Sequence, residues 1–358
     1  MAKSTGVARA LAAGLVSGVL AAGTAPAAAE ETGGTDDGPA VDNGAVVLMY
    51  HRFGNEKYPS TNVRMEQFKN HVAELSKDTY TVLPLPAIVD ALENNEPLPD
   101  HAVAITVDDA YESFFTKAWP LLKEAGLPVT LFAATQPIED DYKTIMSWDQ
   151  LETFAQHELG TVGNHTHTHA HMPEQSIDTN LEEIERSQAL LKKHLGEKPD
   201  LFSYPYGEYS TDIAKLVAEK GFRAAVGQHS GAIGRTKDLL TLPRFAINEA
   251  YGGMDRFTLV TNSLPLPAEQ VTPRERVLTP DTNPPIYGFT AHDTVEHLDS
   301  LSCYASGRGK VTHKLLGQRV EIRLDKPLRE GRSRINCTMP TPSGRWRWLG
   351  AQFLVPTD

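Results

Sequence analysis

The chain has 358 residues, of which 40% are hydrophobic and 22% charged, as is usual for a globular protein. Its formal net charge is −12, and an acidic chain argues against nucleic acid as a partner, because nucleic-acid phosphates attract basic surfaces. Residues 286–358 differ from the rest, with 11 Lys and Arg against 7 Asp and Glu.

The N-terminus has the pattern of a secretory signal peptide, which we place at residues 1–29. Lys3 and Arg9 form a positively charged region, residues 10–23 are small and apolar, and Ala27-Ala28-Ala29 fits a cleavage site. The apolar run is too short and too rich in Gly and Ala for a stable membrane span, although an uncleaved anchor is the alternative. We therefore expect an exported protein, periplasmic or secreted, with no transmembrane span once the signal is cleaved.

Strand-like and helix-like segments alternate after residues 30–44, which are poor in apolar groups and predict a disordered leader. Residues 45–50 form a continuous apolar run, which is typical of strands buried on both faces of a parallel sheet. The repeated βα units predict a parallel sheet over 45–263, either doubly wound or closed into a barrel. We expect strands at 45–50, 102–107, 129–134, 159–163, 200–204, 222–227 and near 239–243, and helices at 65–77, 86–94, 111–125, 147–157, 178–195 and 210–220.

Residues 264–285 contain six prolines, which predicts a semi-rigid linker. Beyond it, apolar residues alternate with polar ones, so residues 286–358 are expected to form a small all-β module. The two cysteines, Cys303 and Cys337, lie in this module, and in an exported protein they predict a structural disulfide. Trp346 and Trp348 share one face of a strand, where they either fill the module's core or form a platform for sugars.

Two carboxylates, Asp108 and Asp109, directly follow the strand predicted at 102–107. Adjacent carboxylates raise each other's pKa unless they are neutralised, which favours a functional role. The structural alternative is that Asp109 caps the helix that begins near Tyr111. Consecutive residues of an extended chain point in different directions, so the pair cannot supply the facing carboxyl groups of a glycosidase. One aspartate that binds a metal ion beside one that faces the substrate fits better.

Four of the 13 histidines fall within seven residues, at His165, His167, His169 and His171. Imidazole is the commonest metal ligand, which predicts a metal site, and a polar surface loop is the alternative. On a helical turn His165 and His169 share a face and can bind one cation, whereas a strand would align all four. Two histidines and one aspartate leave coordination positions open, as in catalytic zinc sites.

Three motifs, Val107-Asp108-Asp109, His165-Thr166-x-x-His169 and Tyr204-Pro205-Tyr206-Gly207, lie at the predicted strand ends. In this order and at these separations they resemble the polysaccharide deacetylases of the NodB-homology type, carbohydrate esterase family 4. The resemblance covers about residues 45–250 and implies an irregular (β/α) barrel of the NodB deacetylase type, here followed by the all-β module.

The resemblance also implies roles for the motif residues. Asp108 corresponds to the general base, and Asp109, His165 and His169 correspond to the ligands of a divalent metal, for which this ligand type favours zinc. The Tyr206 backbone N–H corresponds to the oxyanion-hole donor, and Pro205 shapes the same substrate-binding loop.

Two positions depart from the family's commonest pattern. No clear leucine-x-histidine motif follows residue 207, but Leu48-Met49-Tyr50-His51 resembles the arrangement in biofilm poly-N-acetylglucosamine deacetylases. This implies that His51 is the general acid, with His229 as the competing candidate. Ser203 stands where the family has an arginine that orients the base. Arg244 could supply that charge from the next strand end, or could form a surface salt bridge.

The resemblance implies a metal-dependent hydrolase that removes N-acetyl groups from an extracytoplasmic polysaccharide, such as poly-N-acetylglucosamine, peptidoglycan or a chitin-like polymer. An O-acetyl esterase would use the same residues. A catalytically silent glycan-binding protein is the alternative from a different class, and the complete set of base and metal ligands argues against it.

Overall fold

The computed structural model describes residues 43–236 and 238–357. The predicted signal peptide at 1–29 lies outside the described residues, as does all of the predicted leader at 30–44 except its last two residues. Within the described parts of the chain, none of the helices combines the length and apolar character that a bilayer crossing requires.

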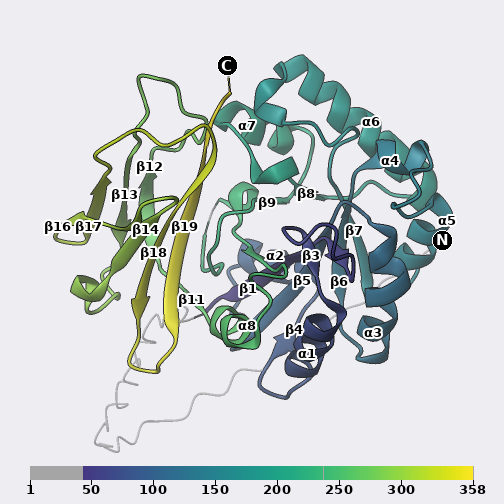
Figure 1. Cartoon of the computed structure of the whole chain (residues 1–358), viewed down its shortest axis with the longest axis horizontal. Coiled ribbons are helices and arrows are strands. Elements are labelled where there is room, and N and C mark those ends of the chain that lie inside the picture. The colour runs from purple at the N-terminus through teal and green to yellow at the C-terminus, as the bar shows by residue number, and fades with distance from the viewer. Residues whose placement is uncertain (1–42, 237, 358) are drawn as a thin grey trace, which may run out of the picture. The chain divides into compact units, whose positions relative to one another are not determined.

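The first part of the described chain is built around one sheet whose neighbouring strands all run parallel (Figure 1). The strand order β10-β1-β5-β6-β7-β8-β9 follows the chain, except that β10 returns beside β1, and β4 also pairs with β5. Val226, at the end of β9, forms an isolated parallel bridge to Leu242, just before β10. The sheet therefore curls toward closure, and the predicted irregular (β/α) barrel is confirmed. Its strands are β1 (Ala45–Tyr50), β4 (Thr81–Val82), β5 (Ala102–Asp108), β6 (Val129–Ala133), β7 (Gly160–Asn164), β8 (Leu201–Ser203), β9 (Ala224–Val226) and β10 (Phe245–Ala246).

Helices connect these strands, and several begin at a serine cap. Ser147, Ser176 and Ser210 each accept a hydrogen bond from the backbone N–H three residues later, which satisfies a free donor of the first helical turn. The longest of the described helices ends at Gly196, whose left-handed backbone stops it. The helices are α1 (Met65–Leu75), α2 (Leu85–Glu93), α3 (Trp119–Glu124), α4 (Thr135–Glu139), α5 (Trp148–Ala155), α6 (Ile177–Leu195), α7 (Thr211–Glu219) and α8 (Met254–Thr261).

Two predicted elements differ from the structure. The helix expected at 111–125 begins as a π-helical turn, Phe114–Ala118, and becomes α3 only at Trp119, where Pro120 in its first turn suits a helix start. The strand expected near 239–243 is instead a 3₁₀ turn, Leu239–Thr241, followed by the two-residue strand β10.

The C-terminal module consists of two sheets over one apolar core, and the predicted all-β module is confirmed. Part of the predicted linker at 264–285 joins these sheets, because β11 pairs with β19 and β12 pairs with β13. Cys303 and Cys337 lie opposite each other on β14 and β18 and form the predicted disulfide. One sheet contains β11 (Leu264–Pro265), β19 (Trp346–Val355), β18 (Gly331–Pro340), β14 (Ser302–Ala305) and β15 (Gly309–Val311); the other contains β12 (Ala268–Thr272), β13 (Ile286–Ala291), β17 (Arg319–Arg323) and β16 (His313–Leu316).

The two tryptophans of β19 do not both fill the module's core. Trp348 packs edge-on against Phe245 of β10, with ring centroids 5.1 Å apart, so it lies between the module and the barrel. Trp346 is 38% exposed. Trp348 therefore binds the two parts of the fold together.

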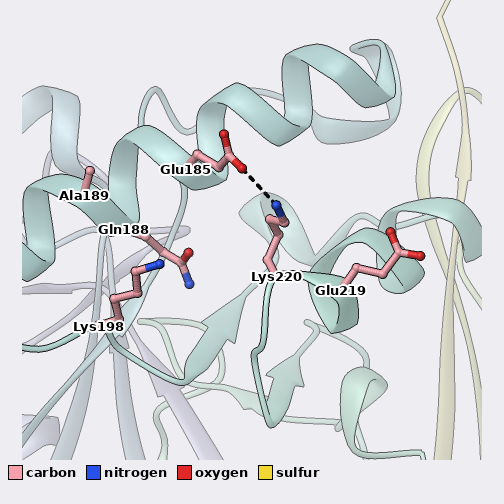
Figure 2. Close-up of a pocket in the computed structure, with 6 residues that line it drawn as sticks. All are labelled: Glu185, Gln188, Ala189, Lys198, Glu219 and Lys220. Atoms are coloured by element: carbon pink, nitrogen blue, oxygen red, sulfur yellow. Dashed lines mark hydrogen bonds and ion pairs between the residues drawn. The ribbon is translucent and has the colours of Figure 1, made fainter.

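A shallow hollow lies between α6 and α7, where the charged side chains of Glu185, Lys198, Glu219 and Lys220 gather (Figure 2). Lys220 is paired with Glu185 at 2.9 Å. The hollow contains none of the residues that the motifs predict, and we assign it no role.

Acidification is expected to destabilise the fold through His71. This side chain is fully buried, bonds the Gly252 carbonyl through Nε2 at 2.8 Å, and stacks on Phe257. Burial lowers its pKa to about 4. In the unfolded chain His71 takes up a proton near pH 6.5, so above that pH the burial of His71 costs the fold no stability. Stability is lost as the pH falls toward 4, by roughly 3 kcal/mol in all.

Urea unfolding at pH 7 and pH 4.5 measures this loss. His71→Gln should show a smaller drop between the two pH values than the wild type, because glutamine does not titrate. An equal drop in both proteins would contradict the assignment.

Candidate active site

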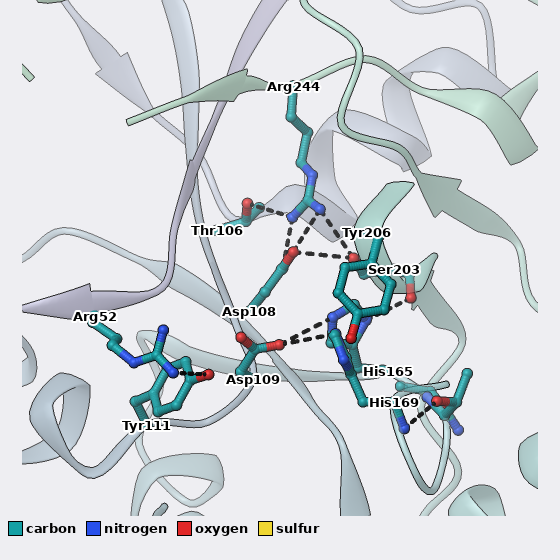
Figure 3. Close-up of polar contacts among 12 residues, drawn as sticks. Arg52, Thr106, Asp108, Asp109, Tyr111, His165, His169, Ser203, Tyr206 and Arg244 are labelled. Carbon is teal, nitrogen blue, oxygen red and sulfur yellow. Dashed lines mark hydrogen bonds and ion pairs between the residues drawn. The ribbon is translucent and has the colours of Figure 1, made fainter. Parts of the chain in front are cut away.

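The two predicted carboxylates lie at the carboxyl end of β5, as the sequence indicates. Asp108 is the last residue of the strand, and Asp109 follows it with a φ of +76°, a backbone region that L-residues rarely adopt. Ala110 is also left-handed, with φ +54°. This turn directs the two neighbouring carboxylates to different partners (Figure 3), and it also means that Asp109 is not a helix cap, because it is followed by another left-handed residue.

Asp108 is held by Arg244 through two parallel hydrogen bonds. Arg244 Nη1 donates to Oδ1 and Nη2 donates to Oδ2, both at 2.7 Å, and both side chains are fully buried. Arg244 also donates to Ser203 Oγ and Thr106 Oγ1 (Figure 3). It is therefore not the surface salt bridge of the alternative interpretation. A planar guanidinium fixes the plane of the carboxylate as well as its charge.

Burial by itself would raise the pKa of Asp108, but the Arg244 charge and its hydrogen bonds outweigh burial and lower it. Ser203 donates to Oδ2 at 3.3 Å. This oxygen thus accepts from both Arg244 and Ser203, whereas Oδ1 accepts from Arg244. Each carboxylate oxygen has two lone pairs, so Oδ1 keeps the freer acceptor position.

The histidine segment after β7 is an irregular loop, neither the helical turn nor the strand that the sequence allowed. β7 ends at Asn164, and Thr166 and His169 are left-handed, with φ of +65° and +58°. The His169 N–H donates to Thr166 Oγ1 at 3.1 Å, which closes the turn. Just before the loop, a Cβ at Gly163 would lie 2.4 Å from the Phe132 ring, so glycine is needed there.

This loop brings His165 and His169 to the same carboxylate oxygen. Asp109 Oδ1 lies 3.4 Å from His165 Nε2 and 3.2 Å from His169 Nε2 (Figure 3). Ligand atoms of the three side chains all lie within 4.8 Å of one another, and this is the one such group of His, Cys, Asp and Glu found among residues 43–236 and 238–357.

The chemistry of the donor set fits a bound cation. His165 Nδ1 lies 2.6 Å from the Ser203 carbonyl oxygen, which can only accept, so Nδ1 carries the proton. In the neutral ring, Nε2 then presents a lone pair toward Asp109 Oδ1. Both of these atoms are buried without a hydrogen-bond partner. Two acceptors that face each other away from water are costly unless a proton or a metal ion lies between them.

The other two histidines of the segment have different partners. His167 is buried and bonds Thr135 Oγ1 through Nδ1 at 2.9 Å. His171 bonds Glu208 through Nδ1 at 2.7 Å and stacks on the Tyr206 ring. Neither belongs to the group around Asp109.

His51 follows β1, which is the neighbour of β5. Tyr50 lies opposite Val107 in the sheet, so His51 and Asp108 leave the sheet at the same edge. Burial lowers the pKa of His51, while the nearby charges of Asp109 and Asp108 oppose that shift. The competing residue, His229, is buried, and its burial and the charges of nearby arginines lower its pKa to about 3. A group with so low a pKa carries no proton near neutral pH.

The loop after β8 contains Pro205, Tyr206 and Gly207. Tyr206 has a left-handed backbone, with φ +58° and ψ 4°. Its ring contacts His169 edge-on, with centroids 4.6 Å apart. A Cβ at Gly207 would lie 2.4 Å from the Gln228 backbone nitrogen, which explains the glycine of this motif. The loop is thus in contact with one member of the Asp109 group.

Comparison with known proteins gives this arrangement a family. Residues 95–225 match the family model described as polysaccharide deacetylase. Residues 95–225 therefore belong to a polysaccharide deacetylase domain. A putative polysaccharide deacetylase of Bacillus subtilis, YxkH, is 26% identical to it over 208 residues, which cover 58% of this chain and 72% of that protein. The poly-beta-1,6-N-acetyl-D-glucosamine N-deacetylase of Staphylococcus epidermidis is 23% identical over 235 residues, which cover 58% and 81%.

Solved structures share the fold of the polysaccharide deacetylase domain. The Streptococcus pyogenes deacetylase PplD, solved in complex with acetate, matches with a TM-score of 0.56 and 23% identity, covering 61% of this chain and 98% of that one. IcaB from Ammonifex degensii matches with a TM-score of 0.54 and 24% identity, covering 61% and 96%.

The candidate site also contains residues to which the sequence motifs assigned no role. Thr106 and Ser203 complete the hydrogen bonds around Arg244 and Asp108. The Arg52 guanidinium stacks over the Tyr111 ring and donates to its hydroxyl, next to Asp109 (Figure 3). Arg52 directly follows His51, and Tyr111 comes two residues after Asp109. Position beside a motif residue was therefore the one available signal for this pair.

Proposed function

We propose that this deacetylase is a metal-dependent hydrolase that removes N-acetyl groups from a polysaccharide outside the cytoplasm. The observation that carries the proposal is the pair of buried, unpartnered acceptors, Asp109 Oδ1 and His165 Nε2, beside a carboxylate fixed by Arg244. A protein that merely bound glycans would have no use for an oriented base next to a cation site. The signal-like pattern of residues 1–29 supports export.

Asp109, His165 and His169 would hold the metal, and this ligand type favours zinc. When bound, the ion would polarise the acetyl carbonyl and lower the pKa of an adjacent water. Asp108 would accept a proton from this water as the water oxygen attacks the acetyl carbonyl carbon. We assign this proton to Oδ1, because Oδ2 already accepts from both Arg244 and Ser203. Arg244 would keep the carboxylate ionised and in one orientation.

Two further groups would complete the reaction. The Tyr206 backbone N–H would donate to the oxyanion that forms as water adds to the carbonyl, and Pro205 would fix the course of this loop. His51 would donate a proton to the amine as the C–N bond breaks, since an amine leaves poorly without one. His51 suits this step better than His229, because the charges of Asp108 and Asp109 act on His51, whereas those that act on His229 come from Arg276, Arg334 and Arg244.

The polymer is proposed from the relatives. One of them is named as a poly-beta-1,6-N-acetyl-D-glucosamine N-deacetylase, and the position of His51 near the start of the barrel resembles the biofilm deacetylases. We therefore place poly-N-acetylglucosamine first among substrates, with peptidoglycan and chitin-like polymers after it.

Acetate release tests this function. The purified protein is incubated with oligomers of β-1,6-linked N-acetylglucosamine, with peptidoglycan and with chitin oligomers, and O-acetylated xylan is included as an ester substrate. We expect release from the amide substrates that stops after chelation and returns with Zn²⁺. Release from xylan alone would favour the O-acetyl esterase, and no chelator-sensitive release from any of these polymers would refute the proposal.

Replacing His51 by alanine is expected to reduce amide hydrolysis by about 10²- to 10⁴-fold, the usual contribution of a general acid. Hydrolysis of 4-nitrophenyl acetate should fall much less, because nitrophenolate leaves without a proton. His229→Gln is the matched control and should leave both rates close to wild type. Equal losses with both substrates in His51→Ala would contradict the acid role.

A further inference from the structure

We propose that the C-terminal β module is part of the active site, because Gln352 and Arg332 of this module position the Tyr206 loop. This inference rests on the proposed function, in which the Tyr206 N–H is an oxyanion donor. Both residues act through the loop and not on the substrate, so they are positioning residues.

Gln352 makes the central contact. It lies on β19 and is 4% exposed, and its Nε2 donates to the carbonyl oxygens of Tyr206 at 3.0 Å and Gly207 at 3.1 Å. One amide nitrogen thus uses both of its protons on two consecutive carbonyls of the loop. These two bonds fix the peptide planes on either side of Gly207.

Arg332, on β18, holds the same loop from a second direction. Its Nη1 is 3.5 Å from the Tyr206 carbonyl oxygen, and its guanidinium lies over the Tyr206 ring at 5.2 Å. It also pairs with Glu208 at 3.7 Å, and the buried Glu208 carboxylate in turn bonds His171 at 2.7 Å. The His171 ring stacks on the Tyr206 ring, with ring centroids 3.9 Å apart, so His171 contacts the same loop.

The loop needs such external support because its own backbone is in an unfavourable region. Tyr206 has a φ of +58°, which is uncommon for a residue with a side chain and persists when the surroundings hold it. An oxyanion donor must point at the developing charge before the reaction begins. In the described chain, the contacts to the Tyr206 carbonyl come from the module, at Gln352 and Arg332.

The module can position the loop because it is firmly joined to the barrel. β19 pairs in parallel with β11, the strand that follows α8, and Trp348 packs on Phe245 of β10. A Cβ at Gly350 would lie 2.1 Å from the Ser230 carbonyl oxygen, so the backbone of β19 touches the barrel two residues before Gln352. Main-chain contact of this kind leaves little freedom for the module to shift.

Gln352→Met tests the proposal, because methionine keeps the length of the side chain and removes both donors. We expect kcat for acetate release to fall by about tenfold or more, as misplacement of a positioned group does, with KM within about twofold of wild type. Arg332→Met removes the second contact at a half-exposed position and should lower kcat in the same way. Arg345→Met is the matched control: Arg345 also joins the module to the barrel, at Asp100 and the Asn262 carbonyl, and does not touch the Tyr206 loop.

Amide hydrogen exchange gives a readout that does not depend on activity. Peptides that cover residues 204–209 should exchange faster in Gln352→Met and Arg332→Met than in wild type, and at the wild-type rate in Arg345→Met. Unchanged exchange and kcat in Gln352→Met would overturn the inference, and so would an equal loss of kcat in Arg345→Met, since docking alone would then explain it. If the wild-type protein releases no acetate, the proposed function is refuted. The exchange measurement would then still show whether Gln352 and Arg332 hold the Tyr206 loop in place.

Discussion

Replacing Asp109 by alanine is expected to weaken metal binding by more than about 100-fold, because even partners outside the ligand set cost 10- to 100-fold when they are lost. Asp108→Asn should instead retain the metal and lose activity by about 10²- to 10⁴-fold, the contribution of a general base. The reason is geometric. Asp109 Oδ1 faces both histidines, whereas the Asp108 oxygens face Arg244.

Metal content measured by mass spectrometry and acetate release measured on the same samples separate the two roles. Asp149→Asn serves as a control, since Asp149 lies in the first turn of α5 and outside the site. Equal loss of metal in Asp108→Asn and Asp109→Ala would contradict the division of roles, and full activity in Asp108→Asn would remove Asp108 as the base.

The sequence was informative wherever a local pattern determines structure. Continuous apolar runs located β1 and β5, because strands buried on both faces must be apolar along their whole length. Polar residues directly after such runs located Asp108 and His51, since parallel strands bring their carboxyl ends to one edge. The pairing of Cys303 with Cys337 followed from export and the presence of just two cysteines.

The remaining features depend on contacts between distant segments. Arg244 lies 136 residues from Asp108 in the chain, and nothing in its own segment shows whether it is buried. The loop that carries His165 and His169 is set by left-handed residues and by hydrogen bonds to α4 and α6, which periodicity cannot reveal. The prolines of 264–285 suggested a spacer, but proline is compatible with a short edge strand such as β11, whose contact with β19 is tertiary.

Backbone strain gathers at the proposed site. Ten residues other than glycine have a positive φ in the described chain, and five of them, Asp109, Ala110, Thr166, His169 and Tyr206, belong to the three motif loops. Each such residue costs of order 1–3 kcal/mol, so the rest of the fold must hold them in place. The Asp108–Arg244 pair and the contacts from the β module lie directly beside these strained turns, and they supply that support.

Replacing Arg244 by methionine is expected to lower the free energy of unfolding by about 3–5 kcal/mol, because it leaves the buried Asp108 carboxylate without its counter-charge. Activity should fall with it, since the base loses its orientation. Arg244→Lys should recover part of the stability and little of the activity, because one ammonium cannot form the two parallel hydrogen bonds. Urea unfolding and acetate release measure the two effects.

The double variant Arg244→Met with Asp108→Asn separates charge from packing. It should be more stable than Arg244→Met, since the buried negative charge is gone, and it should remain inactive.

The pH dependence of the free energy of unfolding provides an independent test of the charge effect. In the wild type the lowered Asp108 pKa stabilises the fold above about pH 4, the usual aspartate value, and this stability is lost as the pH falls through the lowered pKa.

In Arg244→Met, burial would instead raise the Asp108 pKa above its usual value. This variant should therefore lose stability as the pH rises through that higher pKa, because the buried carboxylate then has to ionise without a counter-charge. The stability gap between wild type and Arg244→Met, measured in chelator, is therefore expected to be narrower at pH 4 than at pH 7. A gap that does not change with pH would mean that the cost of the substitution comes from packing around Arg244 and not from the charge of Asp108.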